Sequence, residues 1–229
     1  MGLKESGLRG SLRNVSVGID AIPDDEIDQF ENYQPNGSDE LSDFYSNDVS
    51  AFSIGESGFE GGQNLQTDDT SSSNNTIASF PGDGLPNYPA QGDLVWGRIR
   101  CDSTEMNLQF NVNYQDDDNR VFPLIRYRTG SIALISVSNG DVVAEDDTDF
   151  NASDFTGEYL FLKLSLNENN TYDVIVEDEG GNELASLSIS DDSNVGNDGI
   201  AFRASQSGDQ NANDGKWDEF VMLEGGADS

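Results

Sequence analysis

The segment from Met106 to Tyr114 restricts the fold of this chain more than any other stretch. Its apolar residues alternate with asparagine and glutamine, and the apolar set is Met106, Leu108, Phe110, Val112 and Tyr114. Because successive side chains of a β-strand point to opposite faces of a sheet, this alternation predicts an antiparallel strand with one buried face. An acidic turn at 116–119 follows, and residues 120–128 are predicted to return as the partner strand.

Similar short strands, separated by turns rich in Gly, Asn and Asp, are predicted over the rest of the chain. They cover residues 93–101, 131–138, 158–167, 171–178, 182–190, 198–204 and 216–223. Asn139-Gly140-Asp141 and Gly180-Gly181-Asn182 have the composition of hairpin turns. Many short strands at regular spacing predict an all-β fold, a jelly-roll sandwich of two antiparallel sheets.

The charge of the chain limits the conditions in which such a sandwich is stable. The 229 residues include 44 acidic and 11 basic residues, which gives a net charge of −33. Repulsion of this size destabilises a compact state, and molar salt relieves it by shortening the screening length to about 3 Å. A disordered acidic chain is the alternative. The 12 Phe, the 7 Tyr and the patterned strands favour a folded, halophilic protein instead.

Several function classes are excluded by what the composition lacks. The chain has no histidine and a single cysteine, Cys101, which argues against zinc sites, imidazole chemistry and an internal disulfide. It offers no basic surface for nucleic acid. No stretch approaches the roughly 20 apolar residues that span a bilayer, and the N-terminus lacks the apolar core of a signal peptide. We therefore expect a protein made in the cytoplasm, without membrane insertion.

The N-terminal residues differ from the rest in charge. Residues 1–19 contain three basic residues against Glu5 alone, a net charge of +2. Two interpretations stay open, a frayed tail or a basic and apolar anchor that orders on an acidic partner. The chain is therefore divided into an extended arm, 1–26, and a sandwich domain, 27–229. The anchoring residues are predicted to be Lys4, Leu8, Arg9, Leu12 and Arg13.

Several segments resemble a known fold family. TYDVIVEDEGGNELASLSISD (171–191), DGIAFRAS (198–205) and GKWDEFVML (215–223) resemble the closing strands of laminin-G-like, concanavalin-type jelly rolls. FENY (30–33), AFSIGESGFEGGQNLQ (51–66) and FPGDGLPNYPAQGD (80–93) resemble their opening strands. The arm, MGLKESGLRGSLRNVSVGIDAIPD, resembles the N-terminus of such proteins from haloarchaeal tailed viruses and proviruses.

This resemblance implies a virion structural protein. It would display a lectin-like domain on the capsid, as a turret or decoration protein, or on the tail, as a fibre or baseplate component. Its expected location is the virion surface, and its expected partners are other virion proteins through the arm, host-surface glycans, and copies of itself as a trimer or pentamer. A purely architectural protein without a ligand is the alternative.

A basic sheet face is the first candidate site. Alternation on strands 93–101 and 120–128 puts their basic residues on one face, beside the amide-rich face of 106–114. Such a groove suits acidic or sulfated glycans, because arginine pairs bidentately with carboxylate and sulfate. In the alternative interpretation, the arginines neutralise neighbouring acids and hold strands together. The candidate residues are Trp96, Arg98, Arg100, Asn111, Arg126 and Arg128.

A structural calcium site is the second candidate, and it is implied by the resemblance. Jelly rolls of the carbohydrate-binding type often join their first and last strands through an ion. The matching positions are Glu31 and Asp218, with loop oxygens from residues 56–63. Calcium takes six to eight oxygen ligands, which these groups would supply. The predicted role is stability, without a part in catalysis.

An enzymatic site is considered and rejected. Glu26, Asp28 and Glu31 fit the E-x-D-x-x-E pattern of laminarinase-type glycoside hydrolases, whose retaining mechanism needs two carboxyl groups about 5–5.5 Å apart. In those enzymes the motif lies mid-chain on a concave face, among aromatic residues. Here it opens the domain, directly after other acidic residues. We therefore predict that the protein is not an enzyme.

Overall fold

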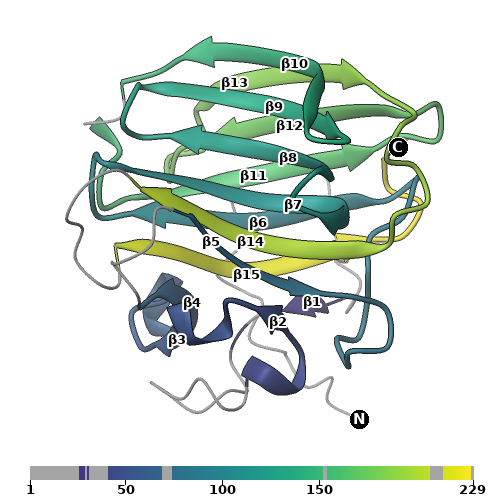
Figure 1. The fold of residues 1–229 in the computed structure, drawn as a ribbon. Helices are drawn as coiled ribbons and strands as arrows, with labels where there is room; N and C mark the ends of the chain where they lie inside the picture. Colours follow the sequence, from purple (N-terminus) through teal and green to yellow (C-terminus); the bar gives the residue numbers. More distant parts are fainter. Residues whose placement is uncertain are drawn as a thin grey trace, which may run out of the picture.

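The strands form a sandwich of two antiparallel sheets (Figure 1). The structure is a computed structural model, and it describes residues 26–28, 30, 41–68, 74–151, 154–206 and 214–227. Sheet A has the order β13 (Glu183–Ser190), β12 (Thr171–Glu177), β11 (Tyr159–Leu166), β6 (Leu94–Cys101), β15 (Gly215–Leu223), β4 (Asn64–Thr67) and β3 (Phe52–Gly55), and β1 (Glu26–Asp28) also pairs with β15. Sheet B has the order β10 (Asp141–Asp149), β9 (Ser131–Ser138), β8 (Asn119–Arg126), β7 (Met106–Asp116), β14 (Gly199–Gln206), β5 (Asn74–Ser79) and β2 (Ser46–Asn47).

The predicted all-β class and most predicted strands are confirmed. β6, β7, β8, β9 and β11 to β15 lie where the alternation places them, with ends shifted by about two residues or less. The short 3₁₀ turns η2 (Leu41–Asp43), η3 (Val49–Ala51) and η4 (Phe59–Gly61) are the helical elements of the described residues. No helix in this described part is long and apolar enough to cross a membrane.

Two segments differ from the expectation. Residues 80–93, which resemble an opening strand, form turns and bends between β5 and β6. β10 was not predicted, because Asp141–Asp149 is acidic on both faces and shows no apolar alternation. β10 is the edge strand of sheet B and is largely exposed, so no buried face demands apolar residues there.

The core lies between the sheets and is rich in aromatic rings. The Phe110 and Phe220 rings approach to 4.4 Å between centroids, and Phe202 packs edge-on against Phe220 at 5.0 Å. Gly97 of β6 makes room for this cluster, because a Cβ atom there would collide with the Phe220 ring. Trp217 is fully buried, and its indole N–H donates to the backbone oxygen of Gln109, 3.0 Å away. Sequence segments far apart thus meet in one packed layer.

A β-bulge in β7 changes which way Tyr114 points. Asn113 has a φ of 46°, and the pairing of β7 with β8 shifts between Val112 and Asp116. The Asn113 side chain donates inward to the Tyr172 hydroxyl, so the next residue, Tyr114, turns outward. The sequence pattern predicts that Tyr114 is buried, and it is 2% exposed, but it packs with Ala78, Ala201 and Phe80 in a separate small cluster instead of the main core.

Residues 1–25 of the arm lie outside the described residues, and its last residue, Glu26, is the first residue of β1. Residues 1–25 include Lys4, Leu8, Arg9, Leu12 and Arg13, so the anchoring role and the boundary between arm and domain stay predictions. The first described strand, β1, pairs with the last strand, β15, which agrees with the expected adjacency of first and last strands.

Candidate binding face

The predicted groove residues lie in different sheets. Trp96, Arg98 and Arg100 project from the outer side of β6 in sheet A, whereas Asn111 and Arg126 belong to sheet B. The sheets face each other across the core, so their outer sides point in opposite directions (Figure 1). Arg128 follows β8 in the turn before β9. The structure therefore does not bring the six residues together in one groove, and a glycan contact of any single one stays a prediction.

Arg98 is a structural cation. Its guanidinium lies between the Phe59 and Phe161 rings, 3.5 and 3.9 Å from their centroids, and its side chain is 1% exposed. Its Nε donates to Glu219 at 2.5 Å. Asp218, directly opposite in the β6–β15 pairing, accepts the Phe59 backbone N–H at 2.5 Å. Buried in this way, Arg98 holds the 3₁₀ turn of Phe59 against sheet A.

The neighbouring residues on β6 are also engaged. Trp96 is 6% exposed, so its ring is not the open platform that the sequence predicted. Arg100 pairs with Asp102 at 2.6 Å and lies 5.6 Å from the Tyr159 ring. On sheet B, Arg126 pairs with Glu145 of β10 at 2.9 Å.

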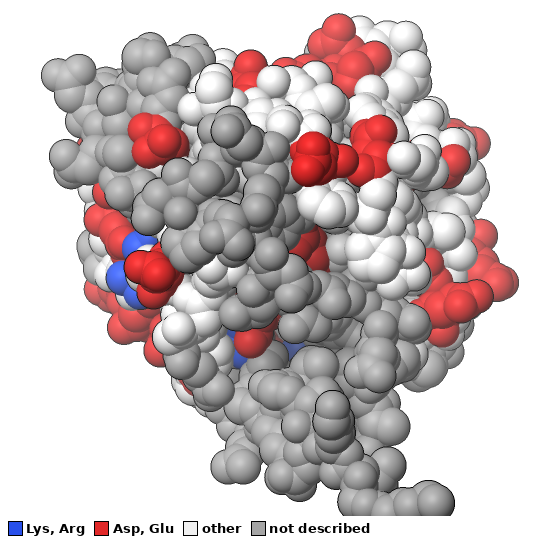
Figure 2. Space-filling view, turned by 90° about the horizontal axis from the view of Figure 1, so that it is seen from below, with Lys and Arg blue, Asp and Glu red and all other residues white. Residues whose placement is uncertain are grey.

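Every basic residue of the described part pairs with an acidic one. This pairing is what the alternative interpretation of the arginines expected. Figure 2 shows its effect on one side of the molecule, where the few blue atoms lie next to red ones. The eight residues are Arg98, Arg100, Arg120, Arg126, Arg128, Lys163, Arg203 and Lys216.

A polar strip crosses the outer face of sheet B on its central strands. Gln109 of β7 lies opposite Arg203 of β14, and Asn111 lies opposite Ala201. Their neighbours along each strand, such as Phe110 and Phe202, belong to the core, so these polar side chains point away from it. The polar strip consists of Asn107, Gln109, Asn111, Arg120 and Arg203.

At one end of this strip, two arginines share a single carboxylate. Asp117, in the β7–β8 turn, lies 2.6 Å from Arg203 and 3.2 Å from Arg120. Arg203 also approaches the Thr76 hydroxyl at 3.4 Å, and the Tyr114 hydroxyl donates to Asp117 at 3.2 Å. Burial, and then the nearby Arg203 charge, lower the pKa of Arg120. Burial and the Asp117 charge raise the pKa of Tyr114, so this phenol stays protonated.

The polar strip contains buried polar atoms without a hydrogen-bond partner. Buried polar groups in native proteins are nearly always paired, so a cluster of exceptions needs an explanation. The guanidinium groups leave donors unpaired, and the amides leave acceptors unpaired. These groups are buried, since Asn111 is 0%, Gln109 6% and Arg120 8% exposed. The atoms are Nε of Arg120 and Arg203, Oδ1 of Asn107 and Asn111, and Oε1 of Gln109.

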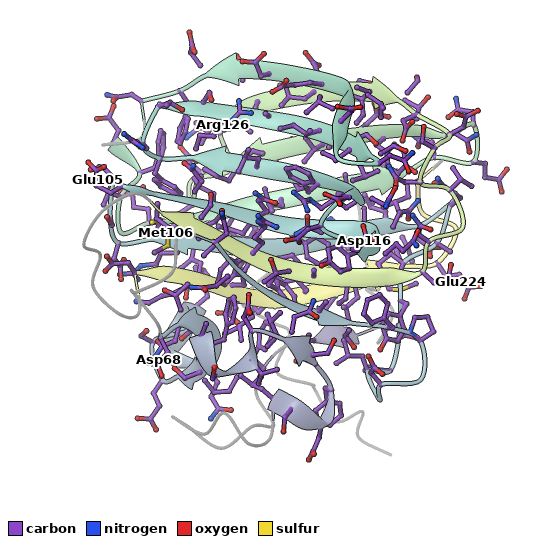
Figure 3. All side chains as sticks on the ribbon, in the orientation of Figure 1. Asp68, Glu105, Met106, Asp116, Arg126 and Glu224 are labelled. Carbon is purple, nitrogen blue, oxygen red and sulfur yellow. The ribbon has the colours of Figure 1, made fainter. Side chains whose placement is uncertain are left out.

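A cavity of about 350 Å³ adjoins the strip. The Tyr114 ring connects the two, because it lines the cavity while its hydroxyl contacts Asp117. This end of β7 is marked by Asp116 in Figure 3, and Arg126 lies at the opposite end of the sheet. The lining combines two aromatic rings with amide and carboxylate groups, and its residues are Phe80, Pro81, Tyr114, Gln115, Gly196, Asn197, Asp198 and Gly199.

The sequence interpretation missed most of this site, although one signal was present. On strand 198–204, Ile200 and Phe202 point inward, and the same alternation puts Arg203 on the outer face. Asp117 had been assigned only to a turn. Asp117 pairs with both arginines because β8 and β14 flank β7. The alternation within one strand does not show which strands are its neighbours.

The calcium prediction is not tested by the described residues. Asp218 faces Arg98 and already accepts the Phe59 N–H, and Glu31 lies outside the described residues. Among the residues that the structure describes, no group of three acidic, cysteine or histidine side chains is placed to hold a metal. Calcium binding stays a prediction, which a calcium titration of the unfolding temperature would test; an unchanged temperature would contradict it.

One residue of the glycoside-hydrolase pattern has a structural role. Asp28 is 4% exposed and accepts hydrogen bonds from the Tyr45 hydroxyl at 2.5 Å and the Phe30 N–H at 2.8 Å. This carboxylate connects β1 to the segment that follows η2. The absence of enzymatic activity stays a prediction.

The fold defines the class of protein, a jelly-roll sandwich of two antiparallel sheets. Similar solved structures include a protein of unknown function from Shewanella oneidensis MR-1, with 11% identity, 78% of this chain and 72% of that chain covered, and a TM-score of 0.51. A carbohydrate-binding module from Bacillus subtilis follows with 11% identity, coverage of 76% and 92%, and a TM-score of 0.43. A galectin from Caenorhabditis elegans has 12% identity, coverage of 59% and 84%, and a TM-score of 0.40.

These likenesses concern the fold alone. No protein-family model matches the sequence, and the search of curated proteins gives no match.

Proposed function

We propose that the protein binds glycans on the outer face of sheet B, without a catalytic step. The observation that carries this proposal is the polar strip, whose five buried atoms lack partners beside a cavity of about 350 Å³. Sugars present hydroxyl groups that donate and accept, and C–H faces that pack on aromatic rings. Amide acceptors, guanidinium donors and the rings of Phe80 and Tyr114 match both properties.

A pair of matched variants tests this site. We expect Gln109→Ala to weaken glycan binding about tenfold or more, because the amide lies in the middle of the strip, where sugars pair with polar groups. Gln66→Ala is the control, since it removes the same amide from the outer side of sheet A. Binding is measured with a glycan array in molar KCl, followed by titration of the best ligand. Equal effects of the two variants, or no ligand for the native chain, would overturn the proposal.

For the biological setting, we propose a virion surface protein of a haloarchaeal virus that attaches to host glycans. The support is the resemblance of residues 1–24 to the arms of such proteins and the halophilic charge of the body. In this proposal the arm contacts other virion proteins and the sandwich faces outward as part of a homo-oligomer. Changing Lys4, Arg9 and Arg13 to Glu in the full chain should abolish particle association but leave adsorption of the free protein to haloarchaeal cells intact. Unchanged particle association would contradict the anchor.

An architectural role is the second candidate, because every described basic residue already pairs with an acidic one. Replacing Arg126 and Arg128, which are not part of the polar strip, tests the architectural role. Loss of assembly would favour architecture, whereas intact assembly together with cell adsorption that Gln109→Ala abolishes would favour recognition.

A further inference from the structure

We propose that Asp117 is an internal competitor for an acidic ligand, and that a ligand carboxylate or sulfate replaces it between Arg120 and Arg203. This inference rests on the proposed glycan-binding function. It adds that the ligand is acidic, and that Asp117 neutralises the two arginines while no ligand is bound.

The arginine pair is under-neutralised by the groups that surround it. Arg120 and Arg203 come from β8 and β14, the strands on either side of β7, and both pair with the one carboxylate of Asp117. Both guanidinium groups contact it through a terminal nitrogen, and both Nε atoms remain unpaired. A carboxylate or sulfate binds a guanidinium best through two parallel N–H donors, which Asp117 does not engage.

The Asp117 carboxylate is the most exposed part of this cluster. The Arg120 and Arg203 side chains are 10% and 12% exposed and project from central strands, so the sheet holds them in place. The Asp117 side chain is 52% exposed and belongs to the turn between β7 and β8. A ligand anion therefore displaces Asp117 into solvent without disturbing the sheet.

The cavity gives the rest of the ligand a place. Tyr114 contacts Asp117 through its hydroxyl and lines the cavity with its ring. An acidic sugar with its ring in the cavity would thus lie beside the arginine pair. The net charge of −33 repels such a ligand at long range. In molar salt this repulsion is screened within about 3 Å, whereas buried contacts are screened much less.

The test uses two ligands with the same sugar backbone, trigalacturonic acid and its fully methyl-esterified form, in which the carboxylate charges are removed. Both are titrated calorimetrically into the full chain and its variants in 2 M KCl. We expect the native chain to prefer the acid and Asp117→Asn to bind it at least tenfold more tightly, since the competing charge is gone. Asp118→Asn is the matched control, because it removes one charge from the same turn, and Asp118 acts on Arg120 only through space, without an ion pair in the described residues. Arg203→Gln should lose the preference for the acid.

A second measurement guards against a folding defect. Without Asp117, the arginine pair loses the one carboxylate that it contacts, so Asp117→Asn should unfold at a lower temperature than the native chain. The acid should restore that temperature, and the ester should not.

Three results would overturn the inference. An equal gain in affinity for the acid in Asp117→Asn and Asp118→Asn would show that the gain comes from the lower net negative charge and not from the loss of a competitor. Equal affinity of the native chain for acid and ester, unchanged by Asp117→Asn, would refute the competitor and leave the glycan-binding proposal standing. No binding of either ligand to any form, together with an empty glycan array, would refute both.

Discussion

At the scale of single residues, the few basic side chains of this acidic chain contribute differently to stability, because some are buried and others are exposed. Arg98 is 1% exposed and stacked between two rings, whereas Arg128 is 56% exposed and 4.0 Å from Glu105. The sequence treated both as members of one binding face. A buried ion pair contributes to structure once formed, while an exposed pair at this distance contributes little.

This difference predicts unequal costs of mutation. Arg98→Ala should lower the free energy of unfolding by about 3 kcal/mol, because it removes the buried partner of Glu219 and empties the space between two rings. Arg98→Lys should recover part of this loss. Arg128→Ala, the control, should change it by less than about 0.5 kcal/mol. Urea denaturation in molar KCl measures all three, and equal losses for the two Ala variants would contradict the assignment.

At the scale of elements, β10 illustrates how an edge strand is protected. It pairs with β9 on one side only, and Asp147 and Asp149 are exposed. Asp146 accepts the Ser188 N–H of β13 at 2.9 Å, which joins the edges of the two sheets. Charged side chains on an edge disfavour pairing with a second chain. The acidic composition of β10 is therefore explained by its position at the edge of the sheet.

Neutralising this edge should promote self-association. We expect the variant Asp147→Val, Asp149→Val to form larger species, because an apolar edge strand offers unpaired backbone groups without charge repulsion. The measurement is light scattering after gel filtration in 2 M KCl. The control changes Asp68 and Asp192, two exposed residues outside any strand, to Val. A size shift of the same extent in the control would show that lost charge alone is responsible.

At the scale of the whole molecule, net charge and fold oppose each other. A charge of −33 on 229 residues favours expansion, while the aromatic core between the sheets favours the compact state. The balance depends on ionic strength, because the screening length falls from about 10 Å at 0.1 M salt to about 3 Å at 1 M.

The unfolding temperature should therefore rise steeply with salt. Between 0.1 and 2 M KCl we expect an increase of about 10 °C or more, which corresponds to a few kcal/mol for a chain of this size. Circular dichroism during heating measures the change. Sucrose at equal osmolality is the control, because it leaves charge repulsion in place. A melting temperature that is independent of KCl would refute the salt adaptation.

The local pattern determined most strands and their faces. In β6, β8 and β14 the inward and outward residues follow the alternation, because the pleat of a strand is a property of the strand itself. The two departures from this alternation, at Asn113 and in β10, have causes that lie in the tertiary structure. The bulge at Asn113 is stabilised by the Tyr172 hydroxyl from another sheet, and β10 lost its alternation because it has no buried face.

By itself, the sequence determined an acidic all-β sandwich and the side of each main strand that faces the core. Only the tertiary structure decided that β6 and β8 lie in opposite sheets, that Arg98 is buried, and that Arg120 and Arg203 meet at Asp117. The physical reason is range. Alternation records how a residue lies relative to its own strand, whereas a site on a sheet face depends on which distant strands pair, and long-range packing of the whole core selects that pairing.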